Sequence, residues 1–532
     1  MVSKSSSWFI LAVLVFCWVE FADAAKPNFK SVAKRVDAAI AEEVFSDSDQ
    51  PAPQCDDETY LRRVWLDLVG DIPSPEEVIA FSLDPAKNKR RVVVNQLLKS
   101  PHYGQNWARY WRDVIFSRVL EDRALLAANA MEVDITERLN NGDGWDAIAA
   151  EFITAQGDVR QNGSTAIMMA QSGRTEETTA EMSRIFLGIQ IQCAQCHDHP
   201  YDRWKREQFH ELAAFFPRIG VRAVRDVTQR TFEVYAADRF NNKRKKNNET
   251  RPKAEHFMPD LDDPSAKGTK TQPKFFLTSA SLPFDSTDAE RRQQLSQWFI
   301  ENEWFAIALV NRVWSELVGE GFYEPVDDIG PDRDATAPTA VKLLAKEFES
   351  SGYDYRWLLK TICATEAYQR AARPRRGPED TPMLANVPQR LRSDQLMNAI
   401  FTALEIGEST QDSSPRRPNR RAEFAKTFGY DPSIPREGVS ASIPQVLALM
   451  NSPQINRQLT AGRSGVLGYL LEDIYDDEQL VVELYLRCLS RQPQAEEMDT
   501  ALAYLEESPQ RRFAFEDLLW ALVNSAEFQH RK

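Results

Sequence analysis

Long stretches of the chain repeat hydrophobic residues at intervals of three and four positions, which is the spacing that lines one face of an α-helix. This period predicts helices over residues 181–191, 204–216, 294–318, 339–348 and 389–404. Between residues 220 and 282 the period is lost, and the segments RAVRDV, RTFEVYA and KFFLTS have the composition of short strands. We therefore predict a mainly α, multi-helix, two-domain protein with a small β insertion between the domains.

Even without its first 24 residues, the chain is too long for one hydrophobic core, because single cores stop growing at about 250–300 residues. We assign residues 1–24 to a signal peptide, 25–219 to an N-terminal helical domain, 220–285 to a β-containing insertion or linker, and 286–532 to a C-terminal helical domain. The insertion contains the basic run Lys243–Lys246 among Asn, Thr and Pro residues. This setting predicts a solvated loop rather than a binding patch.

A short unit occurs near both ends of the chain. VWLDLVGDIPSPEE (64–77) aligns without a gap with LYLRCLSRQPQAEE (484–497), and both contain Pro-x-x-Glu-Glu. Three related endings, LLKSPHY, TICATEAY and ALVNSAEF, run from an apolar helix into Ser or Thr and reach an aromatic residue three positions later. We expect both units to be pairs of helices, with packing and capping roles rather than catalytic ones.

The first 24 residues have the pattern of an export signal. Lys4 precedes an apolar run from Trp8 to Trp18, and Ala22-Asp23-Ala24 fits the small-x-small rule for cleavage. We expect a periplasmic or otherwise exported protein with no stable membrane insertion after cleavage, because the run is short for a span. An uncleaved anchor and a lipid attached at Cys17 are the less favoured alternatives.

Composition narrows the range of functions. The chain has 65 Lys and Arg residues against 79 Asp and Glu residues, and this net charge of −14 argues against a nucleic-acid partner. The sequence lacks a Gly-rich phosphate loop, a Gly-x-Ser-x-Gly elbow and a His-Glu-x-x-His motif. Asp327-Asp328 is a candidate acid pair or cation site, but adjacent acids that follow Pro in a loop are usually solvated. We interpret Asn311-Arg312 as structural.

The sharpest chemical feature is the pentapeptide Cys193-Ala194-Gln195-Cys196-His197. With six Cys and six His in the chain, such a string arises by chance on the order of once in a thousand chains of this kind. Two thiols three residues apart on a helical turn face the same way and can form thioethers with the two vinyl groups of one haem. We expect covalent haem c held by Cys193 and Cys196, with His197 as an iron ligand.

A second axial ligand has to come from elsewhere, because two residues of chain do not carry His199 around a porphyrin. The candidates are Met168, Met169, Met182, His210 and Met258. An open iron site is equally compatible with the sequence, and core packing is the default for methionines in an apolar stretch. We further expect the 181–191 helix to deliver Cys193 at its end, and Asp202 to cap the next helix near Trp204.

Two rival interpretations use the same residues. In the first, zinc or another transition metal is bound by thiolate and imidazole donors drawn from Cys193, Cys196, His197, His199 and His210. In the second, the two thiols form a disulfide, and Asp198, His199 and Asp202 belong to a hydrolytic or carbohydrate-facing site. The remaining mature cysteines, Cys55, Cys363 and Cys488, have no short spacing, so a disulfide scaffold is not indicated.

Several segments resemble the exported planctomycete cytochrome-like family. They are YLRRVWLDLVGDIPSPEE, SPHYGQNWARYW and FLGIQIQCAQCHDHPYDRWKREQFHELAAFF in the first half, and NRVWSELVGEGFYEPVDD, RLRSDQLMNAIFTALE, LALMNSPQI, LSRQPQAEEM and LLWALVNSAEF in the second. The resemblance covers nearly all of the mature chain. It implies two largely uncharacterised domains, the first of which bears the Cys-x-x-Cys-His motif on which the cytochrome label substantially rests.

These observations favour an exported c-type haem protein that transfers electrons, or that is the haem-bearing component of a redox enzyme, outside the cytoplasm. Its partner would be a redox protein or an extracellular substrate, and the residues identify neither. The alternative is a metal-binding, hydrolase-like protein or a non-redox binding or scaffold protein of the cell envelope. Helical units reused at both ends of the chain suggest the scaffold role.

Overall fold

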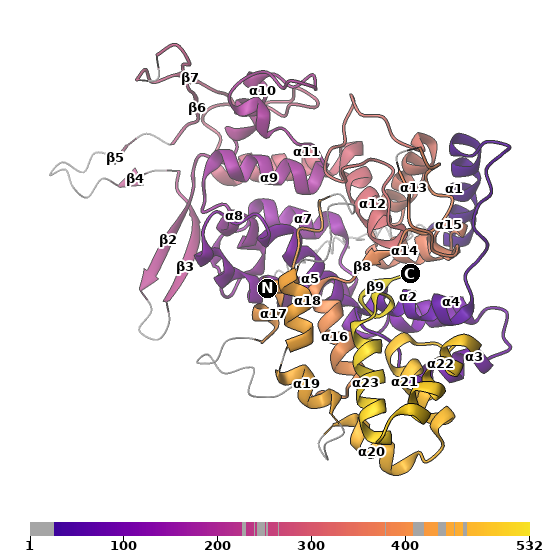
Figure 1. The fold of residues 1–532 in the computed structure, drawn as a ribbon. Coiled ribbons are helices and arrows are strands. Elements are labelled where there is room, and N and C mark those ends of the chain that lie inside the picture. The colour runs from indigo at the N-terminus through magenta and orange to yellow at the C-terminus, as the bar shows by residue number, and fades with distance from the viewer. Residues whose placement is uncertain are drawn as a thin grey trace, which may run out of the picture.

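The computed structural model describes residues 26–225, 230–238, 240–241, 250–251, 254–263, 265–377, 379–407, 420–434, 443–451, 453–460 and 465–532. Within these ranges the protein is mainly α-helical with short strands, which confirms the predicted fold class (Figure 1). The segment 1–24, predicted to be a signal peptide, and the basic run Lys243–Lys246 lie outside the described residues.

Helices dominate the chain up to residue 213. They are α1 (Phe29–Val44), α2 (Asp57–Val69), α3 (Pro75–Leu83), α4 (Lys89–Leu97), α5 (Pro101–Phe116), α6 (Ala128–Asn141), α7 (Trp145–Thr154), α8 (Ala166–Ala170), α9 (Thr175–Leu187) and α10 (Arg206–Ala213). Three 3-10 turns join them: η1 (Asp122–Ala127), η2 (Gly163–Thr165) and η3 (Gln192–Gln195). The helix α5 packs along α6, and α9 leads into η3.

A three-stranded antiparallel sheet follows, with the order β1-β3-β2. Its strands are β1 (Gly157–Asp158), β2 (Ile219–Arg225) and β3 (Arg230–Ala236), and the two-residue strands elsewhere are β4 (Phe240–Asn241), β5 (Thr250–Arg251), β6 (Phe257–Met258), β7 (Thr269–Lys270), β8 (Gln389–Arg390) and β9 (His530–Arg531). Val221 faces Val234 in the β2–β3 register. The strands predicted from RAVRDV and RTFEVYA belong to this hairpin.

The strand predicted for KFFLTS (274–279) is wrong. Lys274 makes only an isolated bridge to Ser281, and the following residues form a turn. The backbone N–H of Phe275 donates to Ala280, and the N–H of Ser279 donates back to Phe275, which closes the loop. Because Phe275 is fully buried, its apolar character anchors a turn to the core instead of marking a strand.

Helices also dominate from residue 288 onward. They are α11 (Asp288–Ile300), α12 (Glu303–Val318), α13 (Pro338–Ser350), α14 (Tyr355–Cys363), α15 (Glu366–Gln369), α16 (Ser393–Ala403), α17 (Arg420–Phe428), α18 (Ile443–Asn451), α19 (Pro453–Leu459), α20 (Val466–Asp473), α21 (Asp477–Leu489), α22 (Ala495–Glu507), α23 (Arg511–Asn524) and α24 (Ala526–Gln529). The single helix predicted for 294–318 is two helices, because Asn302 interrupts it and its side chain accepts from the N–H of Trp304 to cap α12.

The repeated unit forms a helix pair at both places, as predicted. In α2–α3 the first helix ends at Gly70, and in α21–α22 it ends at Ser490, both in the left-handed conformation. In each unit the last Glu of Pro-x-x-Glu-Glu, Glu77 or Glu497, accepts from the backbone N–H of the residue before the second helix at 2.8 Å. The three related endings also behave alike, because their hydroxyl groups cap the next helix: Ser100, Thr365 and Ser525.

The buried helix α12 is central to the larger of two hydrophobic cores. Every residue from Trp304 to Val318 is buried, and α12 packs against α9, α11, α13 and α14. This core contains residues from both sides of the 220–285 segment. The smaller core is formed mainly by α16 and the helices after it, which gather at one end of the molecule, opposite α10 and the strands β6 and β7 (Figure 1).

Asp327 joins helices from the two halves of the chain. Its carboxylate is only 1% exposed and lies between Arg184 of α9, at 2.6 Å, and Arg312 of α12. Ser433 accepts a hydrogen bond from each arginine, at 3.0 and 3.1 Å. The expectation that Asp327 is a solvated turn residue is therefore wrong, because two guanidinium groups replace its water shell.

The helix α2 holds the segment 528–532 in a similar way. Asp67 of α2 accepts from Arg531 at 2.6 Å, with both side chains buried, and Arg63 donates to the carbonyl of Lys532 at 2.8 Å. Arg62 donates to the carbonyl groups of Cys488 at 2.9 Å and Phe528 at 3.1 Å. The first repeated unit is thus hydrogen-bonded directly to the second.

Replacement of Asp327 by Ala should destabilise the protein strongly, because it leaves two arginines buried without their carboxylate. Loss of one partner from a buried pair costs about 3–5 kcal/mol. The neighbouring Asp328, whose side chain is 30% exposed and pairs with Arg333, is the matched control, and Asp328→Ala should cost about 0–1 kcal/mol. Chemical denaturation followed by circular dichroism measures both values. Equal losses for the two variants would contradict the assigned role of Asp327.

Candidate functional site

The Cys-x-x-Cys-His motif begins in the turn η3, which follows α9, and its last two residues, Cys196 and His197, come directly after the turn. That helix ends at Leu187, earlier than predicted, because Gly188 adopts the left-handed conformation and a Cβ there would lie 2.6 Å from Ile329. Cys193 lies inside η3 and Cys196 directly follows it, three residues later, and both thiols are exposed and free.

His197 follows Cys196 on the surface. Its ring atom Nδ1 lies 2.7 Å from the carbonyl oxygen of Asp198. In the tautomer with the proton on Nδ1, His197 donates to this carbonyl and its Nε2 is left as a free acceptor. Histidines that ligate metals use this arrangement, because the second hydrogen bond fixes both the tautomer and the ring orientation.

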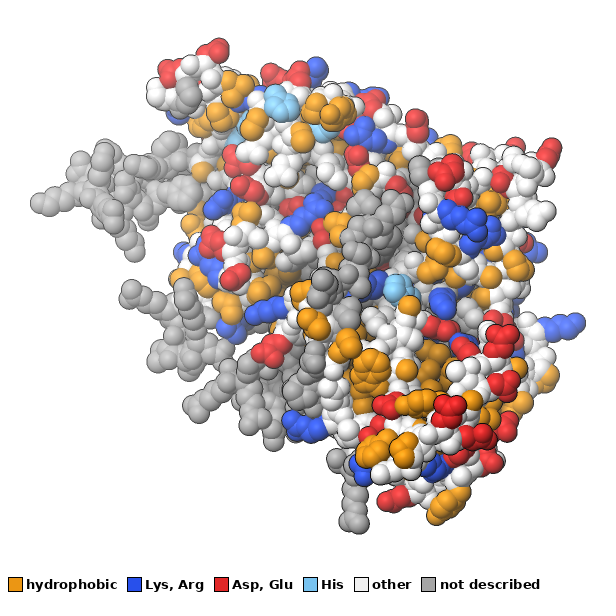
Figure 2. Space-filling model, viewed as in Figure 1, with side chains coloured by type: hydrophobic (Ala, Val, Ile, Leu, Met, Phe, Trp, Pro, Cys, Tyr) orange, Lys and Arg blue, Asp and Glu red, His pale blue; other side chains and the backbone are white. Residues whose placement is uncertain are grey.

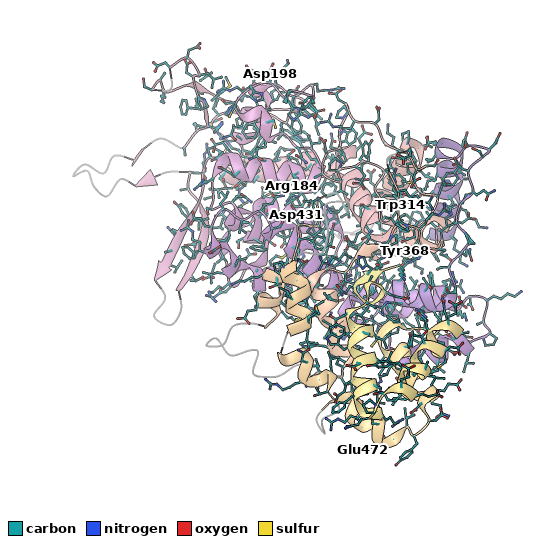
Figure 3. The ribbon with its side chains drawn as sticks, viewed as in Figure 1. Arg184, Asp198, Trp314, Tyr368, Asp431 and Glu472 are labelled. Carbon is teal, nitrogen blue, oxygen red and sulfur yellow. The ribbon has the colours of Figure 1, made fainter. Side chains whose placement is uncertain are left out.

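Asp198 closes the loop that begins at His197. Its carboxylate accepts from the ammonium group of Lys205 at 2.8 Å and from the backbone N–H of Arg206 at 3.1 Å. The hydrogen bond from Lys205 lowers the pKa of Asp198. Asp198 lies at the end of the molecule beside α10, where histidine side chains also gather, whereas Arg184 and Asp431 lie together in its middle (Figures 2 and 3).

His199 has a local structural role. Its ring atom Nδ1 accepts from the backbone N–H groups of Asp202 at 3.0 Å and Tyr201 at 3.3 Å. The backbone N–H of His199 donates to the carbonyl oxygen of Trp204 at 2.8 Å. The predicted cap role of Asp202 is wrong, because Lys205 occupies the N-cap position of α10. Asp202 instead lies near His199, at 3.5 Å, and burial raises its pKa.

The segment 327–333 supports this loop from the second half of the chain. Arg333 donates to Asp202 at 2.9 Å and to Asp328 at 3.0 Å. Arg203 forms a bidentate ion pair with Asp332. Sequence reasoning missed both contacts, and the only signal was the dense alternation of charges in DDIGPDRD.

A buried pair of histidines lies behind η3 and is hydrogen-bonded to it. His210 of α10 lies with its Nδ1 2.8 Å from Nε2 of His256 and its Nε2 3.0 Å from the carbonyl of Gln195, which is inside the motif. The chain of bonds is satisfied when His256 donates to His210 and His210 donates to Gln195, so both rings are neutral. Burial lowers the pKa of each ring to about 4.

The other ligand candidates lie elsewhere. Met168, Met169 and Met182 are fully buried in the larger core, and His210 is 1% exposed with both ring nitrogens bonded. The structure thus brings neither Met182 nor His210 to the exposed side of η3, whereas Met258 in β6 is only partly buried. Among the described residues, no group of three or more His, Cys, Asp or Glu side chains is arranged to hold a metal ion.

The remaining described cysteines are buried. Cys363 of α14 and Cys488 of α21 lie in helices, and burial raises the pKa of Cys488 to about 12. Cys55 is also buried. Only the two thiols of the motif are therefore accessible among the cysteines that the structure describes.

Two family models match the chain, on either side of the β hairpin. PSCyt2, described as a protein of unknown function (DUF1549), matches residues 35–220, and PSD1, described as a protein of unknown function (DUF1553), matches residues 291–428. These matches support a two-domain family of the planctomycete type. No curated protein and no solved structure matches the chain. None of the described helices is long and apolar enough to cross a membrane.

Acid should destabilise the protein through the histidine pair. A histidine with a folded pKa of about 4 stays neutral while the unfolded form, with a pKa of about 6.5, takes up a proton. The free energy of unfolding is therefore at its full value above a pH of about 6.5. As the pH falls from there toward the folded pKa, each histidine lowers this free energy by about 1.4 kcal/mol per pH unit. Denaturation curves at several pH values measure this slope.

His256→Gln keeps a donor for His210 and removes one titrating ring, so it should reduce the slope by about half. The control is Gln293→Ala, at an exposed position on α11, which removes no titrating group and should leave the slope unchanged. If His256→Gln left the slope at its original value, the buried pair would not be the source of the acid sensitivity.

Proposed function

We propose that this chain is an exported c-type haem protein, with Cys193 and Cys196 as the attachment residues and His197 as an iron ligand. The observation that carries the proposal is the accessibility of the motif: two free, exposed thiols lie three residues apart, one in the 3-10 turn η3 and one directly after it, and an exposed imidazole follows. The family model over residues 35–220 carries a name, PSCyt2, that hints at a cytochrome.

The two thiols and the imidazole of the motif fit a covalently attached haem. Thioether formation needs accessible thiols three residues apart, and iron ligation needs an imidazole nitrogen that is not already bonded. His197 meets the second condition when its Nδ1 donates to Asp198. A haem held here would supply one-electron chemistry, and the residues of the chain would fix its position through the hydrogen bonds of Asp198 and His210.

The surroundings of η3 support transfer of electrons to another molecule. Tyr201 lies beside the motif and is 83% exposed, and aromatic side chains are enriched at protein interfaces. Opposite charges are paired around it, with Arg203 bonded to Asp332 and Lys205 bonded to Asp198. Such a surface offers an apolar contact framed by polar groups, which suits a redox partner protein.

The rival interpretations have less support. A zinc site needs at least three donors together, and the described Cys, His, Asp and Glu side chains form no such group. A disulfide between Cys193 and Cys196 is not formed in this structure. A non-redox scaffold role draws support from the hydrogen bonds of Arg62 to the second repeated unit, but those contacts concern packing rather than binding.

Single substitutions in the motif should give distinct patterns when the protein is produced with c-type haem assembly. Cys193→Ala and Cys196→Ala each leave one thioether, so haem becomes partly or fully extractable by acid acetone. His197→Ala keeps the covalent bond and alters the absorption spectrum, because attachment and ligation are separate tasks. Absorbance and intact mass after extraction measure both effects.

The matched control is Cys55→Ala, which removes a buried thiol far along the chain and should retain haem fully. A structural metal would instead make all three motif variants lose stability together. A disulfide would make His197→Ala nearly silent while the two cysteine variants behave alike. The proposal fails if the wild-type protein shows no Soret band and no increase in mass from covalent haem.

A further inference from the structure

A large cleft lies between the parts of the chain matched by the two family models, and its lining does not include the Cys-x-x-Cys-His turn. Its volume is about 1090 Å³, and its walls come from α2 to α5 on one side and from α16 and α17 on the other. Pockets for drug-sized ligands have volumes of about 300–1,000 Å³ and occur preferentially at domain interfaces. The cleft is therefore large enough for a ligand with more than one ring.

Two aromatic side chains supply apolar surface in the cleft. Trp65 of α2 packs against the larger core and Phe401 of α16 against the smaller one, and both remain partly exposed. A third ring, Phe81, is covered by the ammonium group of Lys89, 4.9 Å from its centroid. Flat rings on opposite walls favour a ligand that has apolar faces of its own.

Three of the charged groups in the cleft form ion pairs, whereas the carboxylates of Asp71, Glu77 and Asp84 accept hydrogen bonds from backbone N–H or hydroxyl groups. Lys89 pairs with Asp57 at 2.7 Å, Arg109 with Glu132 at 2.9 Å and Glu405 with Arg487 at 2.6 Å. A charged ligand would have to compete with these ion pairs. Because several carboxylates line the cleft, a neutral ligand is favoured over a polyanion.

Polar groups with spare hydrogen-bonding capacity face the same cleft. His102 and Gln105 are one turn apart on α5, and neither side chain forms a hydrogen bond with another residue in the described part of the chain. Asp71 accepts from Thr402 and from the N–H of Ile72, both at 2.8 Å, and a carboxylate can accept further bonds. Imidazole, amide and carboxylate groups together match hydroxyl groups, which both donate and accept.

We infer that this cleft binds a neutral, hydroxyl-rich ligand of more than one ring, an oligosaccharide. The apolar faces of its rings would lie on Trp65 and Phe401, and its hydroxyl groups would bond to His102, Gln105 and Asp71. This site is separate from η3 and does not depend on the presence of haem.

Isothermal titration with maltohexaose, cellohexaose and xylohexaose tests the inference, and oligogalacturonate serves as the charged comparison. At least one neutral oligosaccharide should bind, and the double variant His102→Ala/Gln105→Ala should weaken that binding about tenfold or more, because two hydrogen-bonding groups are lost. Neither side chain is buried, so the variant should fold normally, which circular dichroism checks.

The matched control is Gln293→Ala, at an exposed position on α11 outside the cleft lining, which should leave the affinity unchanged. The inference is overturned if no neutral oligosaccharide binds at millimolar concentration, if the double variant binds as the wild type does, or if oligogalacturonate binds more tightly than every neutral sugar. Covalent haem is measured on the same samples by absorbance, so failure here is distinct from failure of the proposed haem function.

Discussion

The carboxylate of Asp327, buried between two arginines, is the interaction on which the arrangement of the site depends. Arg184 belongs to α9, the helix that leads to the Cys-x-x-Cys-His turn, and Arg312 belongs to the central helix α12. The residues after Asp327 then reach the turn itself, because Ile329 donates to the carbonyl of Gly188 at 3.0 Å and Arg333 donates to Asp202. One buried charge thus sets the distance between the two halves of the protein around the motif.

Buried arginines recur wherever segments distant in sequence meet. Arg63 and Asp67 of α2 hold the segment 528–532, and Arg62 reaches the second repeated unit. Burial alone would disfavour these charges, and here each one meets carboxylate or carbonyl oxygens. Tyr368 lies at the same junction, where its hydroxyl donates to Asp67 at 2.8 Å (Figure 3). The two repeated helix pairs are therefore held to each other and to the segment 528–532.

The motif has reactive side chains on the surface and a backbone carbonyl that is hydrogen-bonded to buried residues. Its thiols and its imidazole are on the surface, whereas the carbonyl of Gln195 is held from within by His210 and His256. A neutral histidine pair suits this position, because it satisfies the buried carbonyl without placing a charge in the core. The cleft between α5 and α16 is built differently, because it combines aromatic rings with ion pairs and hydrogen-bonded carboxylates. The protein therefore offers two chemically distinct surfaces.

The sequence by itself determined the helical class, the two helix pairs, their caps and the accessible motif. Those features depend on side-chain period and on contacts within about four residues, which a single sequence displays directly. Only the tertiary structure decided that Asp327 is buried, that KFFLTS forms a turn and that Asp202 pairs with Arg333. Arg184 and Asp327 are 143 positions apart, and Asp71 and Thr402, on opposite walls of the cleft, are 331 positions apart. Such contacts arise when packed helices bring charges and rings together, and no local pattern records which partner each side chain will meet.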